Sequence, residues 1–452
     1  MKLDRGLSVN GSTEILLLAL SGTAVPLAAQ PVAPAQVAPV PVVPASTVVA
    51  PDIAAAYDTY HVQPIWFHGG AVDNAAVGQL ISTLQRAPFD GFTDGPRLAA
   101  QVQTVVSQAR LDPASAASAE RALSTAWVRY VQAIRRPTAG MIYAFPVLKP
   151  QGTRTEEILL TATAAPSLQA YLVNTARVNP IYSQLRDAAW AEAQANGNPT
   201  PDPRLLSNLD RVRSIPATGR YLVVDAGASM LTLYEGGQQL DSMKVITGTS
   251  DLPTPLIASM MYYITYNPYW HAPDHLVRKT IAPNVIHLGL KYFSARKYDV
   301  IDEWSENPTV IDPTTIDWKA AAAGTVHLKI RQGPGPLNSM GILKFPFPNP
   351  EDIYLHDTPD HAKFALENRN LSNGCVRVED AKRLGRWLIG RDPVAPGTDP
   401  ETRVQLPKGT PIYLTYVTAQ VRDGKLSYLP DIYGWDTAPP TQFASSIQAS
   451  AN

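Results

Sequence analysis

Residues 353–377 read IYLHDTPDHAKFALENRNLSNGCVR, and this stretch decides how the second half of the chain should fold. At its start the apolar residues Ile353 and Leu355 alternate with Tyr354 and His356. Such alternation predicts a β-strand that turns Ile353 and Leu355 toward a core and the other two side chains toward the opposite face. The stretch therefore predicts a sheet that carries a histidine near a strand end.

The end of the same stretch carries the only cysteine of the chain. Cys375 directly follows Asn373 and Gly374, a pair that favours a turn. The separation of 19 positions from His356 to Cys375 (375 − 356) is enough for a loop and a short helix to return the cysteine beside the histidine. A cysteine attacks as the thiolate and its thiol titrates at about pH 8.5, so it needs a base such as His356. An inert buried cysteine beside a hydrogen-bonded histidine is the alternative.

Composition excludes several classes of protein. The 452 residues correspond to about three structural units. The 38 Lys and Arg against 39 Asp and Glu leave a net charge of -1, which argues against nucleic acid as a partner because nucleic acids select clustered cations. A hydrophobic content of 45% excludes global disorder. A single cysteine excludes an intramolecular disulfide and a multi-cysteine metal cluster.

Residues 1–29 have the pattern of a targeting segment. Lys2 and Arg5 precede an apolar run at 15–20, and small residues surround Ala28, which predicts a secretory signal peptide with an uncleaved membrane anchor as the alternative. Residues 30–51 are rich in Pro, Ala and Val, so we expect an extended linker. The chain is predicted to be exported, and in an oxidising compartment a lone thiol is either deeply buried or chemically used.

Residues 52–213 have mostly helical periodicity. Between 121 and 134 apolar residues recur every three or four positions, at Leu123, Ala126, Trp127, Tyr130, Val131 and Ile134. The stripe has the width of a buried face, so we interpret it as a core helix, with a partner or membrane face as the alternative. A similar pattern covers 167–193 on both sides of Pro180, and the polar residues 196–201 predict a loop.

From Tyr221 onward the period changes to two. Short antiparallel strands are predicted at 221–225, 230–234, 242–247 and 260–266, and the fold class is α+β. Residues 267–324 are interpreted as an insertion over one end of the sheet, after which a strand is expected at 326–330. These limits give a domain at 214–404, further strands within 405–435 and a loose tail at 436–452.

The residues HDTP at 356–359 followed by SNGCVR at 372–377 resemble the signature of the L,D-transpeptidases, cysteine enzymes with the YkuD catalytic fold that cross-link peptidoglycan. The resemblance extends to residues 248–255, 266–270 and 333–349, which look like the larger YcbB-type members, and residues 57–90 are similar to the start of their scaffold domain. It implies a helical scaffold domain at 52–213, a catalytic domain at 214–404 and a capping insertion at 267–324.

Two departures from the family pattern stand out. The family signature usually has histidine where this chain has Asn373, so a second imidazole is absent and the role of base falls to His356. Many YcbB-type members also carry a peptidoglycan-binding module in the scaffold. Between Trp190 and Leu205 this chain has only a short polar loop, so we expect that module to be absent.

The resemblance implies a reaction in peptidoglycan biosynthesis and cell-shape maintenance. Cys375 would attack the carbonyl of the third residue of a donor stem tetrapeptide and release D-Ala. His356 would take and return the proton, and an amine acceptor would resolve the thioester. No cofactor is implied, the partners are peptidoglycan stem peptides with other wall-synthesis proteins as candidates, and a carbapenem should add covalently to the enzyme.

The remaining candidate site residues have weaker assignments. Ser372, Asn373 and Gly374 would form the loop or, through backbone amides, hold the oxyanion. Three others are assigned either to substrate binding or to a structural role: Arg377, Tyr354 and Trp270. No metal site is predicted: His271 and His275 superficially resemble a helical zinc pair, but Pro273 lies between them. Two other functions stay open: a cysteine carboxypeptidase or peptidase acting on wall peptides, and a non-catalytic wall-binding scaffold.

Overall fold

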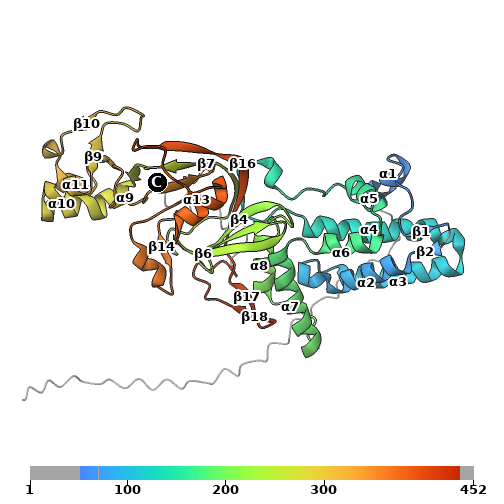
Figure 1. Ribbon diagram of the computed structural model, residues 1–452. Coiled ribbons are helices and arrows are strands. Elements are labelled where there is room, and N and C mark those ends of the chain that lie inside the picture. The colour runs from blue at the N-terminus through green and yellow to red at the C-terminus, as the bar shows by residue number, and fades with distance from the viewer. Residues whose placement is uncertain (1–50, 70, 438–452) are drawn as a thin grey trace, which may run out of the picture. The chain divides into compact units, whose positions relative to one another are not determined.

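The computed structural model describes residues 51–69 and 71–437 (Figure 1). The α+β fold class is confirmed, because helices dominate up to Val212 and strands dominate after it. The predicted signal peptide, nearly all of the predicted linker and residues 438–452 lie outside the described residues. Among the helices of the described part, none combines the length and apolar character needed to cross a membrane.

The first half of the described chain consists of helices with one short hairpin. The helices are α1 (Pro51–Asp58), α2 (Asn74–Arg86), α3 (Gly95–Leu111), α4 (Ala116–Ile134), α5 (Thr155–Thr163), α6 (Leu168–Ala176), α7 (Pro180–Asn196) and α8 (Pro203–Val212). The hairpin pairs β1 (Phe67–His68) with β2 (Ala71–Val72). Helices α1 to α6 share one apolar core, whose largest fully buried side chains include Trp66 and Trp127.

Helix α4 confirms the helix predicted over 121–134. All six residues of the predicted stripe are buried in the helical core. The helix also buries Glu120, whose carboxylate accepts hydrogen bonds from the backbone N–H groups of Ile65, Trp66 and Phe67. These bonds compensate the burial of a charge and fix the preceding segment against α4.

Helix α7 is bounded by a cap at each end. Asn179 accepts a hydrogen bond from the backbone N–H of Tyr182 at 2.9 Å, and Pro180 occupies the first turn. Gly197 ends the helix in the left-handed conformation, with φ 64°. The loop predicted at 196–201 is therefore confirmed between α7 and α8.

The second half is built on one large sheet. Its strands are β3 (Ile142–Tyr143), β4 (Arg220–Asp225), β5 (Met230–Glu235), β6 (Gln238–Gly248), β7 (Ile257–Tyr266), β12 (Leu343–Pro346), β13 (Tyr354–His356), β14 (Asn370–Ser372), β15 (Val376–Val378) and β16 (Thr402–Thr415). The order is β12-β13-β15-β6-β5-β4-β16-β7-β3, with β14 on β6. Because β12 also pairs with β7, the sheet closes on itself and leaves few exposed edges.

The sheet is buried on both of its faces at β4. Leu222 and Val224 belong to an interior core that helix α13 (Ala381–Ile389) also covers. Tyr221 and Val223 belong to a second core, shared with α7 and α8. Burial on both faces explains the uninterrupted apolar run of this strand.

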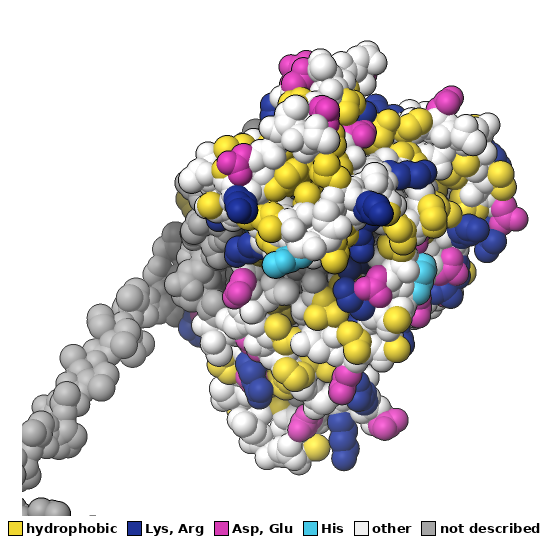
Figure 2. Space-filling view, turned by 90° about the vertical axis from the view of Figure 1, so that its left-hand side faces the viewer, with side chains coloured by type: hydrophobic (Ala, Val, Ile, Leu, Met, Phe, Trp, Pro, Cys, Tyr) yellow, Lys and Arg dark blue, Asp and Glu magenta, His cyan; other side chains and the backbone are white. Residues whose placement is uncertain are grey.

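The insertion has a small sheet and a core of its own. Its elements are β8 (Trp270–Ala272), α9 (Asp274–Leu276), α10 (Ala282–Leu288), α11 (Leu290–Ala295), β9 (Tyr298–Ile301), β10 (Val310–Ile311), α12 (Trp318–Ala323) and β11 (Lys329–Gln332). The sheet order is β10-β9-β11-β8, and Ile330 is fully buried within it. The strand predicted at 326–330 is observed as β11, which pairs with β8 and β9, so the insertion extends beyond its predicted limit at residue 324. Figure 2 shows basic, acidic and apolar side chains interspersed on the face at this end.

The C-terminal part differs from its prediction at two points. Strand β16 runs through the limit expected after residue 404 and is hydrogen-bonded to β4 and β7 in the main sheet. A hairpin of β17 (Ala419–Arg422) and β18 (Lys425–Tyr428) follows it. Asp436, assigned to the loose tail, is instead 4% exposed. Its carboxylate binds Arg211 and accepts hydrogen bonds from Asn208 and Thr418.

We predict that Asp436→Ala lowers the free energy of unfolding by about 3–5 kcal/mol, because it leaves the guanidinium of Arg211 buried without its charged partner. Urea unfolding measures the change. The matched control is Asp392→Ala, which breaks an exposed pair with Arg386 and should change the stability little. Equal losses in the two variants would contradict a structural role for Asp436.

Candidate active site

Cys375 lies at the start of β15, immediately after a tight turn. Gly374 has φ 107°, a conformation that favours glycine. Ser372 holds the turn through its hydroxyl, which donates to the carbonyl of Cys375 at 2.5 Å and accepts from the N–H of Gly374 at 3.2 Å. The local sequence therefore presents the cysteine on a fixed backbone.

A second hydroxyl ties this turn to the neighbouring loop. Thr254 is buried, donates to the carbonyl of Gly374 at 2.7 Å and accepts from the N–H of Gly248 at 2.9 Å. Beside these contacts a small cavity of about 90 Å³ lies between residues 251–255 and the turn. The turn is thus supported from one side, and a small substrate group has space next to it.

We predict that Gly374→Ala destabilises the protein by about 1–3 kcal/mol and lowers turnover. The new Cβ would take up a left-handed backbone conformation and would lie 3.1 Å from Cδ1 of Ile353. Gly397→Ala is the control, because a Cβ added there would meet no atom within 4 Å and its φ is not left-handed. Urea unfolding and turnover measure both variants. A Gly374→Ala protein as stable and active as the control would contradict the strain.

His356 ends β13 with a defined tautomer. Its Nδ1 lies 2.6 Å from the carbonyl oxygen of Asp357. Because a carbonyl oxygen only accepts, Nδ1 carries the proton and Nε2 has its lone pair available. Asp357 is itself held by its carboxylate, which accepts from the N–H of Ile342 at 2.9 Å. The side chain of His356 is 6% exposed, so the ring is fixed and largely shielded from water.

Three basic side chains form a row across neighbouring strands. His356 is paired with Lys344 on β12 and with Arg377 on β15, so all three point to the same face of the sheet. Burial, together with the positive charges of Arg377 and Lys344, lowers the pKa of His356 to about 3, against the opposing hydrogen bond to Asp357. The imidazole is therefore neutral at neutral pH.

The thiol of Cys375 lies diagonally from this histidine. The pairing of His356 with Arg377 places Cys375 two positions earlier on the adjacent parallel strand, and on the same face. With strands about 4.8 Å apart and a rise of about 3.3 Å per residue, such diagonal positions are roughly 8 Å apart at the backbone, a gap that side chains can narrow. Tyr354 lies beside both groups. Its ring centroid is 5.8 Å from that of His356, and its backbone and side chain both form hydrogen bonds with the thiol.

The sulfur itself is half-buried. It lies 3.7 Å from the carbonyl oxygen of Asp352, a residue with a left-handed φ of 51°. Burial raises the pKa of the Cys375 thiol, while Tyr354 and the cations Lys344 and Arg377 oppose that rise. In this arrangement the thiol and the imidazole are both uncharged at neutral pH.

We predict that Lys344→Met raises the pKa of His356 toward its ordinary value, because it removes one of the two cations paired beside the ring. NMR-detected titration of the imidazole measures the shift. Lys344→Arg keeps the charge and should keep the low pKa. Lys363→Met serves as the control, because this lysine pairs with Asp360 outside the row. An unchanged pKa in Lys344→Met would contradict the electrostatic role of the row.

The other predicted residues occupy different environments. Arg377 is partly buried, and its Nε is a buried donor with no hydrogen-bond partner among the described residues. Asn373 is exposed at the tip of the turn. Trp270 lies on β8 and packs partly against the insertion core, with its ring centroid 6.4 Å from that of Tyr298. The structure thus places Cys375 and His356 on one face of adjacent strands with Tyr354 beside each of them, whereas Trp270 belongs to the insertion.

Sequence reasoning missed two members of the site. Lys344 falls within the segment 333–349, but its place beside His356 follows only from strand register. Nothing in the sequence singled out Thr254 as a site residue, although its hydroxyl joins two chain segments that are 120 residues apart. Its position within the segment 248–255 was the only hint available.

Comparison with known proteins gives three similarities. Residues 219–414 match the model of the L,D-transpeptidase catalytic domain, YkuD. Residues 51–188 match the model of the scaffold domain. A protein of Haemophilus influenzae (strain ATCC 51907 / DSM 11121 / KW20 / Rd), named "Putative L,D-transpeptidase", is 26% identical over 395 residues, which cover 85% of this chain and 78% of that protein.

Proposed function

The chain belongs to the L,D-transpeptidases of the YcbB-type arrangement, with a scaffold domain before a YkuD catalytic domain, and we propose that it forms peptidoglycan cross-links through a thioester on Cys375. The single observation that carries the proposal is the placement of the half-buried thiol and the Nε2 lone pair of His356 on one face of adjacent strands. The donor would be a stem tetrapeptide and the acceptor an amine of a second stem.

Acylation would proceed by attack of Sγ on the carbonyl carbon of the third donor residue. The bond from sulfur to carbon forms while Nε2 of His356 takes the thiol proton. When the tetrahedral intermediate collapses, the bond to the nitrogen of D-Ala breaks and the proton passes to that leaving amine. Since thiol and imidazole both start uncharged, proton transfer would accompany attack rather than precede it.

Deacylation would run through the same groups in reverse. The acceptor amine attacks the thioester carbonyl, gives its proton to Nε2, and forms the new amide as the bond to sulfur breaks. The proton then returns to the thiolate, and the free enzyme is restored. Water in place of the amine would give hydrolysis, so the balance between transfer and hydrolysis depends on which nucleophile reaches the thioester.

Backbone amides and cations would stabilise the charges that develop. The N–H of Gly374 already donates to Ser372, so we assign the oxyanion contact to the amide of Cys375 together with the hydroxyl of Tyr354. The unpaired Nε of Arg377 and the ammonium of Lys344 would face a substrate carboxylate. The insertion would act as a lid over Cys375 and His356.

The location of the reaction follows from the same proposal. Peptidoglycan lies outside the cytoplasm, so we propose that the chain works in the periplasm after export through residues 1–29, cleaved or retained as an anchor. We propose residues 52–213 as the scaffold domain and residues 214–404, continued by β16, as the catalytic domain.

Product analysis tests this function. The purified protein is incubated with disaccharide tetrapeptide, and the products are separated and weighed by mass spectrometry. A cross-linked dimer with release of D-Ala is the expected result. Disaccharide tripeptide as the sole product would replace the proposal by a carboxypeptidase, and unchanged substrate with the thiol intact would favour a non-catalytic wall-binding protein.

A further inference from the structure

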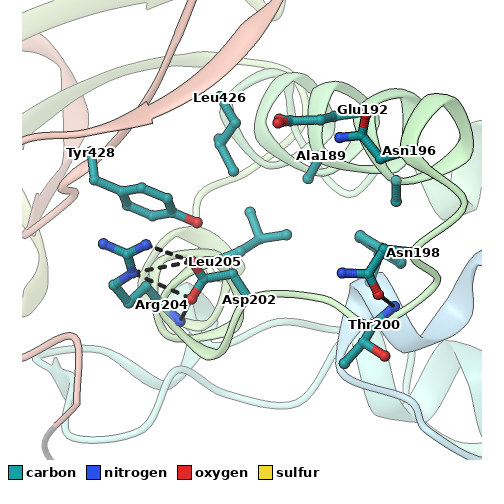
Figure 3. Close-up of a pocket in the computed structure, with 12 residues that line it drawn as sticks. Ala189, Glu192, Asn196, Asn198, Thr200, Asp202, Arg204, Leu205, Leu426 and Tyr428 are labelled. Atoms are coloured by element: carbon teal, nitrogen blue, oxygen red, sulfur yellow. Dashed lines mark hydrogen bonds and ion pairs between the residues drawn. The ribbon is translucent and has the colours of Figure 1, made fainter.

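A second cavity lies away from Cys375, at the junction of the helices with the C-terminal hairpin. It has a volume of about 420 Å³ and is lined by the end of α7, the following loop, the start of α8 and strand β18 (Figure 3). Pockets of this size hold small organic ligands. Its floor is apolar and includes Phe89, Ala189, Leu205 and Leu426.

The rim of the pocket carries polar groups that are not used inside the protein. Glu192 on α7 makes no hydrogen bond or ion pair with the described residues, and neither does the side chain of Asn196 one turn later. The side-chain oxygen of Asn198 accepts from the backbone N–H of Thr200 at 3.2 Å, which leaves its NH₂ group available. Figure 3 shows these side chains facing the space between α7 and α8.

Tyr428 closes the opposite side with an unsatisfied hydroxyl. This hydroxyl is shielded from solvent and has no hydrogen-bond partner among the described residues. The guanidinium of Arg204 lies over the Tyr428 ring, 4.1 Å from its centroid, and binds the carboxylate of Asp202. Figure 3 shows the hydroxyl pointing toward Asp202 and the middle of the pocket. A buried hydroxyl without a partner is costly, so this position favours a ligand that supplies one.

The mixture of groups identifies the class of ligand. Glu192 and Asp202 can only accept hydrogen bonds, Arg204 can only donate, and the asparagines and hydroxyls can do both. Asp202 and Arg204 neutralise each other, so Glu192 is the charged group left for a ligand, and its carboxylate repels an anion and accepts hydrogen bonds from hydroxyl or amide groups. Hydroxyl and amide groups both donate and accept, so an uncharged polyhydroxylated ligand matches the whole set, while its C–H faces would cover the apolar floor.

We propose that this pocket binds a short stretch of N-acetylated amino-sugar glycan, the polymer to which wall stem peptides are attached. The planar acetamido group pairs with side-chain amides as a peptide group does, and its methyl group fits the leucines of the floor. The site is separate from Cys375 and goes beyond the proposed reaction. It would hold the polymer while the catalytic domain acts on the peptides.

Isothermal titration calorimetry with the tetramer of N-acetylglucosamine tests this proposal. The wild-type chain should show saturable binding, and the Cys375→Ala variant should bind equally well, which separates this site from the proposed reaction. Glu192→Ala should weaken binding at least about tenfold, the effect of losing one hydrogen bond to a charged group. Thr200→Trp should abolish binding by filling the pocket from its exposed rim.

Gln194→Ala, an exposed change on α7 outside the pocket, should leave the affinity unchanged, and urea midpoints should match for all variants. The glucose tetramer should bind at least about tenfold more weakly, because it lacks the acetamido groups. Absence of saturable binding to the wild type, or full affinity in Thr200→Trp, would overturn the site. Equal affinity for the glucose tetramer would overturn its assignment to an amino-sugar glycan.

Discussion

Replacing Cys375 by alanine is expected to abolish both cross-linked product and covalent carbapenem adduct. The chain contains no other cysteine, so no second thiol can take over. Loss of the nucleophile should cost at least about 10⁴-fold in turnover, the scale seen when a nucleophile is removed from a catalytic unit. Product formation and the intact mass of the protein after carbapenem treatment measure the two effects.

The matched control for this variant is Leu371→Ala. Leu371 lies on β14 near the turn, and its side chain is 38% exposed. It should keep both the adduct and the turnover, and both variants should unfold at the same urea concentration as the wild type. A carbapenem adduct that persists in Cys375→Ala would show that another residue is the nucleophile.

His356→Gln should lower turnover by about 10²- to 10⁴-fold while Cys375 remains in place. Glutamine retains a side-chain amide but cannot take up the thiol proton. Because the pKa of His356 is about 3 and that of the thiol is raised, kcat/KM of the wild type should stay level from about pH 5 to about pH 8. An inflection near pH 6.5 would instead show that the imidazole titrates at its ordinary value and would contradict the lowered pKa of His356.

The same histidine makes the stability depend on pH. Its pKa is about 3 in the folded protein and about 6.5 in the unfolded chain, so the unfolded chain binds more protons between these values. The stabilising contribution is complete above about pH 6.5 and is lost as the pH falls toward 3. In urea unfolding, the stability of the wild type relative to His356→Gln should therefore decrease with falling pH. A constant difference would contradict the buried neutral imidazole.

Most of what could be predicted about the site and the family came from the signature residues at 356–359 and 372–377. The spacing of His356 and Cys375, with the Asn373–Gly374 turn, pointed to the family that the comparisons bear out. Helix α4 could also be predicted, because apolar residues that recur every three or four positions indicate a helix with one buried face. In both cases the information is local in the sequence.

The register in which the strands pair could not be predicted from the sequence. Lys344 precedes His356 by 12 positions (356 − 344), and Arg377 follows it by 21 (377 − 356), yet all three meet in one row. A shift of one residue in either pairing would turn its partner to the other face, and the sequence does not specify which pairing occurs. The lowered pKa of His356 therefore became evident only with the sheet.

Long-range burial explains why two predicted limits in the second half, the end of the insertion at 324 and the start of the tail at 436, differ from the structure. Residues 326–330 alternate as a strand of any sheet would, and only the packing of Ile330 in the insertion core assigns β11 to the small sheet. Asp436 follows Trp435 near the chain end, where a polar residue is usually exposed. Its burial depends on Arg211, which lies 225 residues earlier.

Mapping the acyl group on the protein tests the central claim most directly. The enzyme is mixed with disaccharide tetrapeptide without acceptor, quenched in acid, digested, and examined by mass spectrometry. We expect the mass of the donor minus one D-Ala on the peptide that contains Cys375, and no such mass in the Cys375→Ala digest. An acyl group on any other residue, or product formed without an acyl group at Cys375, would contradict the account.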